Sequence, residues 1–297
     1  MIELSRLIAL SNRKELEKFI SEGYSGDTYR FVQDIDVSLV KLLKTDFKTA
    51  WQYIQSVGGV FQHLPTEFEP RRLAMIGRYY VHIGENKKAL QYYLKGVGLF
   101  KKAGSAYGVA RLGKSLIEIY SKLGNHKKAL EIGKASLQYF QRRKMELDSS
   151  HLLNNIGLVL YRTDRHRQAM KYLDKAQKIM QKHKSFQLPF VMLNRANVLC
   201  EMHMIRKARG LYEKAAAIYH EYKMHVSENK AYYALAYILF LEDRFTESIR
   251  LFEKVYERSK ELSDPVGAAN ALLDMAEINI QLNQYSTTIM LADQIIP

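Results

Sequence analysis

A small residue recurs about every forty residues along most of this chain, and this period constrains the fold more than any other feature. The small residues lie at Ala89, Ala129, Ala169, Ala208, Ser248 and Thr288. The intervals between them are 40, 40, 39, 40 and 40 residues. A fixed period of this size is the sequence signature of stacked structural repeats. The sequence therefore predicts a repeat protein.

The stretch from Asn154 to Ala169 shows what one repeat contains. A helical pattern of apolar residues ends at a turn signal, Thr163-Asp164, and a second helical pattern follows. Gly157 and Ala169 are small residues twelve apart, one in each predicted helix, and they let the two backbones approach closely. Two helices of about 17 residues, each about 25 Å long, fill one period. A single pair cannot bury its apolar faces, so neighbouring pairs must stack.

The predicted fold is all-α, a right-handed solenoid of stacked antiparallel helix pairs. Proline and glycine mark the turns between short strands, and five prolines and sixteen glycines are too few for a fold of many short strands. We expect residues 1–30 to form a degenerate helical cap and residues 31–69 a degenerate repeat. Residues 70–297 then hold six repeats of about 40 residues, of which the last is truncated.

The composition is that of a soluble globular protein, with 47% hydrophobic and 26% charged residues. The single cysteine, Cys200, excludes an internal disulfide framework and fits a reducing compartment. The first ten residues include Glu3 and Arg6 and lack the apolar run of a signal peptide. No stretch approaches the ~18 apolar residues of a membrane span. We expect a cytoplasmic protein without membrane association.

The net charge of +14 has two explanations. A basic chain is typical of RNA-binding or DNA-binding proteins. Alternatively, the lysines and arginines lie on the solvated outer faces of many helices, with their stems along apolar surface. Because the cations are spread along the chain and not clustered in one arm, the second explanation is favoured.

No motif for catalysis, phosphate binding or metal binding is present in the sequence. Gly96-Val97-Gly98 lacks the third glycine of a dinucleotide fingerprint, and Lys114-Ser115 lacks a phosphate loop before it. Cys200 lies in a predicted helix, where a lone cysteine is typically a small apolar residue. His220 and His225 are five apart and so off a common helical face, which argues against a metal site. We expect no enzymatic activity, catalytic residue, cofactor or metal.

The repeats resemble the tetratricopeptide repeat over about residues 31–296. The resemblance rests on Gly77, Tyr80, Gly84, Ala89 and Tyr93, on Tyr120, Gly124 and Ala129, on Gly157, Ala169 and Ala176, and on Ala196, Ala208, Tyr212 and Ala215. The period exceeds the usual length of about 34 residues, which makes each helix about one turn longer. The resemblance implies the fold and a role in protein–protein interaction.

A narrower resemblance is to the repeat arms of bacterial CHAT proteins, in which a caspase-like peptidase domain follows the repeats. It rests on Leu153-Asn154-Asn155-Ile156-Gly157, on residues 193–199, and on residues 273–277 followed by Leu282-Asn283. The sequence ends at Pro297 inside a predicted helix and contains no peptidase. We therefore expect an N-terminal fragment of a longer protein, with a downstream peptidase domain as one partner.

In tetratricopeptide solenoids the first helix of each pair lines the concave groove where peptides bind. Carried onto this chain, the resemblance implies a basic portion, an amide-rich middle and a third portion with two tyrosines. These candidate residues are Arg71, Arg78, His82, Arg111, Lys114 and Lys122; His151, Asn154, Asn155, Arg162, Asn194 and Asn197; and Lys230, Tyr233 and Tyr237. The asparagines either hydrogen-bond a peptide backbone or are ordinary solvated polar residues, and both interpretations stay open.

The function expected from the sequence is a protein-interaction scaffold that binds a protein or peptide, an acidic one by charge complementarity. A first alternative is a sensory or regulatory arm of a CHAT-type peptidase. A second is a basic RNA-binding or DNA-binding solenoid, whose affinity would fall steeply with salt.

Overall fold

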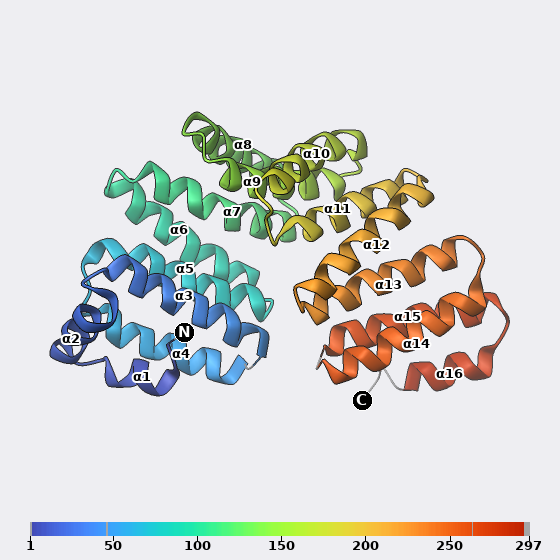
Figure 1. The fold of residues 1–297 in the computed structure, drawn as a ribbon, viewed down its shortest axis with the longest axis horizontal. Helices are drawn as coiled ribbons and strands as arrows, with labels where there is room; N and C mark the ends of the chain where they lie inside the picture. The colour runs from blue at the N-terminus through green and yellow to red at the C-terminus, as the bar shows by residue number, and fades with distance from the viewer. Residues whose placement is uncertain (1, 46, 263, 294–297) are drawn as a thin grey trace. The chain divides into compact units, whose positions relative to one another are not determined.

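Helices joined by short turns make up the described chain (Figure 1). The structure is a computed structural model that describes residues 2–45, 47–262 and 264–293, and within those ranges it contains no strand. The chain forms two compact units, Met1–Asp148 (unit 1) and Ser149–Pro297 (unit 2). A turn expected at Asp46 and the end of the last expected repeat, residues 294–297, lie outside the described residues.

Unit 1 begins with two short helices and continues with longer ones. Its elements are α1 (Leu4–Ala9), α2 (Arg13–Tyr24), α3 (Thr28–Thr45), α4 (Phe47–Phe61), the 3-10 turn η1 (Thr66–Phe68), α5 (Glu69–His82), α6 (Asn86–Lys102), α7 (Ala106–Lys122), α8 (His126–Arg142) and the start of α9 (Glu146–Tyr161). Helix α3 begins before residue 31, so the expected border between cap and first repeat falls inside a helix. The division of the chain into a cap and repeats stays a prediction.

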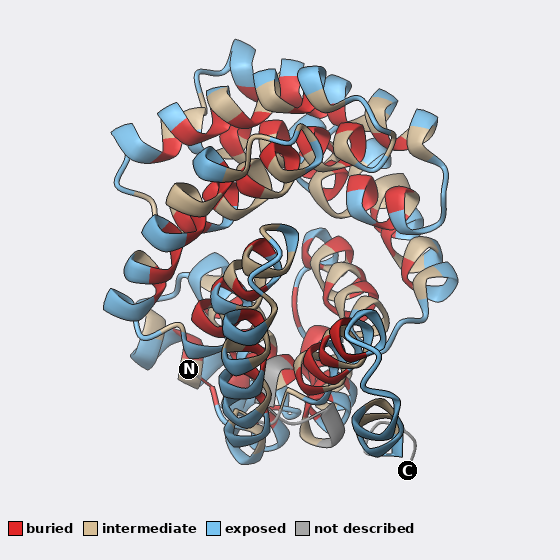
Figure 2. Ribbon diagram, turned by 90° about the vertical axis from the view of Figure 1, so that its right-hand side faces the viewer, coloured by how far each residue is buried: buried red, intermediate tan, exposed pale blue. Residues whose placement is uncertain are grey.

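Unit 2 holds the rest of α9 and seven further helices. These are α10 (His166–Lys182), α11 (Leu188–Glu201), α12 (Ile205–Glu221), α13 (His225–Leu241), α14 (Phe245–Glu261), α15 (Pro265–Gln281) and α16 (Tyr285–Asp293). Consecutive helices from α10 to α16 pack against each other. In both units the buried residues lie where helices face one another, and exposed residues cover the outer sides (Figure 2).

A continuous apolar core holds the first four helices of unit 1 to α5. Leu7, Leu16, Leu39 and Tyr53, from four different helices, are all fully buried in it. The backbone N–H of Ile2 donates to Ser38 Oγ at 2.8 Å. These contacts explain why the weakly periodic N-terminal residues are ordered helices, because their apolar side chains share one core with the later repeats.

The recurring small residues lie where helices touch. Ala89, Ala129, Ala169, Ala208 and Ser248 are completely buried, whereas Thr288 in α16 is only half-buried. A Cβ added to Gly157 would lie 2.7 Å from Leu173 Cγ, which is closer than packed carbon atoms approach. The small side chains therefore set the distance between the two helices of a pair.

A residue in the left-handed conformation forms part of most turns between helices. Asp164 has φ 56° and Asn283 has φ 59°, while Gly84 takes the same role with φ 81°. In the turn after α9, the N–H of Arg165 returns to Leu160 O at 2.9 Å and so satisfies a carbonyl at the helix end. The turns predicted at Thr163-Asp164 and Leu282-Asn283 lie between helices, as expected.

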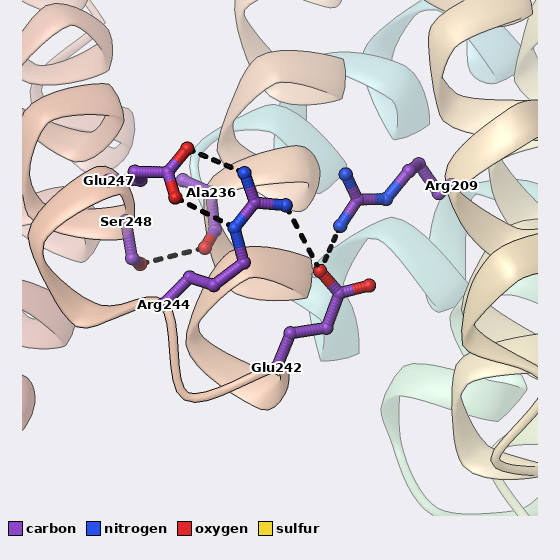
Figure 3. Close-up of polar contacts among 6 residues, drawn as sticks. All are labelled: Arg209, Ala236, Glu242, Arg244, Glu247 and Ser248. Atoms are coloured by element: carbon purple, nitrogen blue, oxygen red, sulfur yellow. Dashed lines mark hydrogen bonds and ion pairs between the residues drawn. The ribbon is translucent and has the colours of Figure 1, made fainter.

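Ion pairs between neighbouring helices add to the apolar contacts in unit 2. Arg209 of α12 and Arg244 both point at the carboxylate of Glu242, which follows α13 (Figure 3). Arg244 also bonds Glu247 at 2.6 Å, and Ser248 Oγ donates to the carbonyl of Ala236 at 2.8 Å. Glu242 thus joins α12 to the turn between α13 and α14.

We predict that Ala169→Leu lowers the free energy of unfolding by about 1–3 kcal/mol, because a leucine at this fully buried contact overpacks the helix pair. Urea denaturation followed by circular dichroism measures the change. Lys175→Leu is the matched control, since it places the same side chain at an exposed position of the same helix. Equal unfolding midpoints for the two variants would contradict the assignment of the contact.

The buried phenol of Tyr53 predicts a pH dependence. Burial raises the pKa of Tyr53 from 10.0 to about 12, so the fold favours its neutral form. This contribution to stability is fully present below pH 10 and is lost as the pH rises towards about 12. Tyr53→Phe should therefore lose less stability between pH 8 and pH 11 than the wild type in urea titrations, and Tyr107→Phe, an exposed control, should behave as the wild type.

Candidate binding site

A pocket of about 240 Å³ opens between helices α3, α5 and α7 of unit 1. The sequence assigned six residues to the basic portion of the groove. Four of them, all cations, line this pocket: Arg71, Arg78, Arg111 and Lys114. They come from α5 and α7, which are the first helices of two successive pairs. The fold therefore brings together residues that are up to 43 positions apart in the chain.

Two of the four cations have carboxylate partners. Arg78 forms an ion pair with Asp36 of α3, and Lys114 forms one with Asp148 at the start of α9. Burial alone would lower the pKa of Arg78, but attraction to Asp36 outweighs it and the pKa of the guanidinium is raised. These two ion pairs link neighbouring first helices and are part of the packing of unit 1.

The other two cations, Arg71 and Arg111, form no side-chain hydrogen bond or ion pair with any residue in the described parts of the chain. The half-buried guanidinium of Arg71 lies over the ring of Tyr29, 5.0 Å from its centroid. Burial lowers the pKa of Arg71, and the nearby charge of Arg111 lowers it further. The pocket therefore contains positive charge that the described residues do not neutralise by a direct contact.

The remaining wall of the pocket is mostly apolar. Pro70, Ala74, Phe100 and Leu112 contribute hydrocarbon surface. Gln33 and Ser115 add neutral polar groups. The volume lies below the roughly 300–1,000 Å³ of typical small-molecule sites, so the pocket is suited to one or two side chains of a ligand.

The other two residues of the basic portion, His82 and Lys122, lie away from the pocket. His82 is the last residue of α5 and is exposed. Lys122 ends α7 and pairs with Glu118 at 2.8 Å, one helical turn earlier. The basic portion thus separates into pocket residues and residues at the helix ends.

In unit 2 the predicted amide residues form a polar row across neighbouring first helices. Asn194 of α11 donates to Asn154 Oδ1 of α9 at 2.8 Å, and Asn154 in turn donates to Asn155 at 3.3 Å. Asn197 Oδ1 accepts a hydrogen bond from Tyr212 at 2.6 Å. An amide carries both a donor and an acceptor, so side chains of this kind can bond a neighbour in both directions.

Tyrosines continue this row towards α15. Tyr161 of α9 donates to Glu201 of α11 at 3.4 Å. Burial is the main reason that the pKa of the Tyr233 phenol of α13 is raised, and the nearby carboxylate of Asp274 of α15 raises it further. Lys230 and Tyr233 also line a second small pocket, while the ring of Tyr237 is 39% exposed. His151 lies half-buried on α9, and Arg162 is exposed just after it.

His220 and His225, which the sequence placed off a common helical face, lie close together in the fold. His220 ends one side of a turn and His225 begins the next helix, and both contact the carboxylate of Glu228, at 2.9 and 3.5 Å. The helical-face argument was wrong here because the two residues are not on one helix. Within the described ranges no group of three His, Cys, Asp or Glu residues is arranged to hold a metal ion.

Cys200 lies half-buried, with its thiol 3.7 Å from the hydroxyl of Tyr212. Burial raises the pKa of the Cys200 thiol, which favours the protonated and weakly nucleophilic form.

No helix in the described chain has both the length and the apolar character needed to cross a membrane.

The sequence did not identify the acidic partners Asp36 and Asp148 or the aromatic partner Tyr29. Asp36 and Tyr29 lie on α3, in a stretch whose first helix we did not assign to the groove. The available signal was the helical pattern of that stretch, which makes α3 a first helix like α5 and α7.

Comparison with known proteins supports the fold. The sequence profile of the tetratricopeptide repeat matches residues 109–182, and that of the soluble NSF attachment protein, SNAP, matches residues 157–265. No curated protein sequence matches the chain.

Several solved structures are similar to this chain. A Rap protein complexed with competence and sporulation factor has a TM-score of 0.72 and 14% identity, over 99% of this chain and 94% of that one. NprR in complex with its cognate peptide NprX has a TM-score of 0.68 and 14% identity, over 99% and 87%. A STAND protein with a tetratricopeptide repeat sensor, from Pyrococcus horikoshii, has a TM-score of 0.67 and 14% identity, over 99% of this chain and 44% of that one.

The stacked helix pairs and these similarities define an α-solenoid repeat protein. Its helix pairs are similar to tetratricopeptide repeats, whose sequence profile matches residues 109–182. The prediction of an all-α solenoid and the resemblance to the tetratricopeptide repeat are both confirmed.

We predict that Asp36→Asn lowers the free energy of unfolding by about 1–3 kcal/mol, because Arg78 then lacks its counter-charge in a largely buried position. The double variant Asp36→Asn/Arg78→Gln should be less destabilised than the sum of the two single variants. Thermal and urea unfolding measure the stability of the wild type, the two single variants and the double variant. Additive effects would show that the pair contributes no coupling.

Proposed function

We propose that this protein is an interaction scaffold that binds a partner protein or peptide along its first helices. The observation that carries the proposal is the pocket in unit 1 with two unpaired guanidiniums, Arg71 and Arg111. The amide row of unit 2 supports it, because asparagines can bond a peptide backbone as both donor and acceptor. Two similar structures are complexes, a Rap protein with competence and sporulation factor and NprR with its cognate peptide NprX.

A binding role without catalysis is consistent with the chemistry of the described residues. The Cys200 thiol has a raised pKa and a tyrosine neighbour, which does not activate a nucleophile. The single cysteine of the chain fits a reducing, cytoplasmic environment. We infer an acidic ligand from the charge of the pocket.

A second candidate is a sensory arm of a larger protein. The STAND protein that resembles this chain carries a tetratricopeptide repeat sensor, and this chain spans 44% of its length. The resemblance to the repeat arms of CHAT proteins points the same way. A caspase-like domain in the same reading frame would favour this candidate, and a stop codon after Pro297 would remove it.

The proposal is tested by selecting peptides from a random display library with the full chain as bait. We expect selected peptides to bind the purified protein, and reversal of charge in Arg71→Glu/Arg111→Glu to weaken binding by at least tenfold, since it replaces attraction by repulsion in the pocket. Fluorescence anisotropy measures the affinities.

Lys134→Glu/Arg142→Glu is the matched control, because both residues are exposed cations of α8 with no ion pair in the described chain. It should bind the selected peptides as the wild type does. Equal losses in the two double variants would show that only the total charge matters. A library that yields no binding peptide would contradict a peptide-binding scaffold.

A further inference from the structure

The four cations of the unit 1 pocket differ in how their charge is compensated. Arg78 and Lys114 each have a carboxylate partner on a neighbouring first helix. Arg71 and Arg111 have none among the described residues, and the charge of Arg111 lowers the pKa of Arg71. Because like charges repel each other, we expect the pair itself to add nothing to the stability of the free protein.

The two arginines occupy the same position in successive repeats. They are 40 residues apart, which is one period, so they lie on the adjacent helices α5 and α7. Arg71 is held over the ring of Tyr29 and lies within 6.0 Å of the centroid of Phe68, which restricts its motion. Arg111 is exposed and lies on the wall of the same pocket.

The surroundings of the pair favour a side chain with a short apolar stem and an anionic end. Ala74 and Leu112 supply apolar contacts on α5 and α7, and Gln33 of α3 supplies a neutral donor and acceptor. A guanidinium fork matches the two oxygens of a carboxylate, and a hydrogen bond between these charged groups is stronger than a neutral one.

We propose that Arg71 and Arg111 together form a subsite for the carboxylate of an aspartate or glutamate side chain of the bound peptide. Arg78 and Lys114 are held by Asp36 and Asp148 and so position the helices that carry the subsite. This inference rests on the proposed peptide-binding function and names the group of the ligand that the pocket recognises.

The stability of the free protein distinguishes a subsite from a structural role for Arg111. Arg111→Gln removes like-charge repulsion without breaking an ion pair, so its melting temperature should equal or exceed that of the wild type. Lys114→Gln breaks the contact with Asp148 and should melt at a lower temperature. A clear loss of stability in Arg111→Gln would show that Arg111 has a structural role and would overturn the assignment.

Binding is tested with a fluorescein-labelled octaglutamate peptide, by anisotropy at about 50 mM salt, where charge–charge contacts are weakly screened. The wild type should bind octaglutamate and not octaglutamine. Arg71→Gln and Arg111→Gln should each weaken binding by about 10- to 100-fold, the range expected for a lost hydrogen bond to a charged group. Arg142→Gln, which makes the same chemical change at an exposed position of α8, should bind as the wild type does.

Other outcomes separate the subsite from the scaffold function. If octaglutamate binds equally to Arg71→Gln, Arg111→Gln and Arg142→Gln, or does not bind at all, the subsite assignment is wrong. Peptides selected from the library would still establish the scaffold. If an octapeptide with one phosphoserine among alanines binds more than tenfold tighter than its glutamate counterpart, or if a thymidine oligonucleotide displaces octaglutamate at an equal concentration, the carboxylate is not the recognised group.

Discussion

The close contact between two helix backbones at a small residue is the constraint on which the structure depends. Ala89, Ala129, Ala169 and Ala208 are completely buried, and a Cβ on Gly157 would collide with Leu173. These contacts fix the distance within each helix pair. Each helix pair then presents a defined apolar surface to the next, and stacking buries surface that one pair alone would leave exposed.

The repeat period also determines which side chains meet on the first helices. Residues about one period apart lie on neighbouring first helices, as the bonds of Asn154 with Asn194 and of Tyr161 with Glu201 show. Arg71 and Arg111 share one pocket for the same reason. A substitution at one such position therefore changes the surroundings of its counterpart in the next repeat.

Charge compensation distinguishes structural from candidate functional cations in unit 1. Arg78 and Lys114 contribute to packing because each neutralises a carboxylate of another first helix. We expect repulsion within the uncompensated pair to lower the stability of the free protein, and binding sites commonly retain such unfavourable arrangements because a ligand relieves them.

The sequence by itself determined the helices, the turns and the resemblance to the tetratricopeptide repeat, because a forty-residue period and turn residues such as Asp164 act over short distances. It also identified Arg71, Arg78, Arg111 and Lys114 as cations of one face. Only the tertiary structure decided which of them are paired, since Asp36 and Asp148 lie 42 and 34 residues from their partners. The contacts of His220 and His225 with Glu228 could not be predicted for the same reason: contacts across a turn or between repeats depend on packing geometry, which local periodicity does not specify.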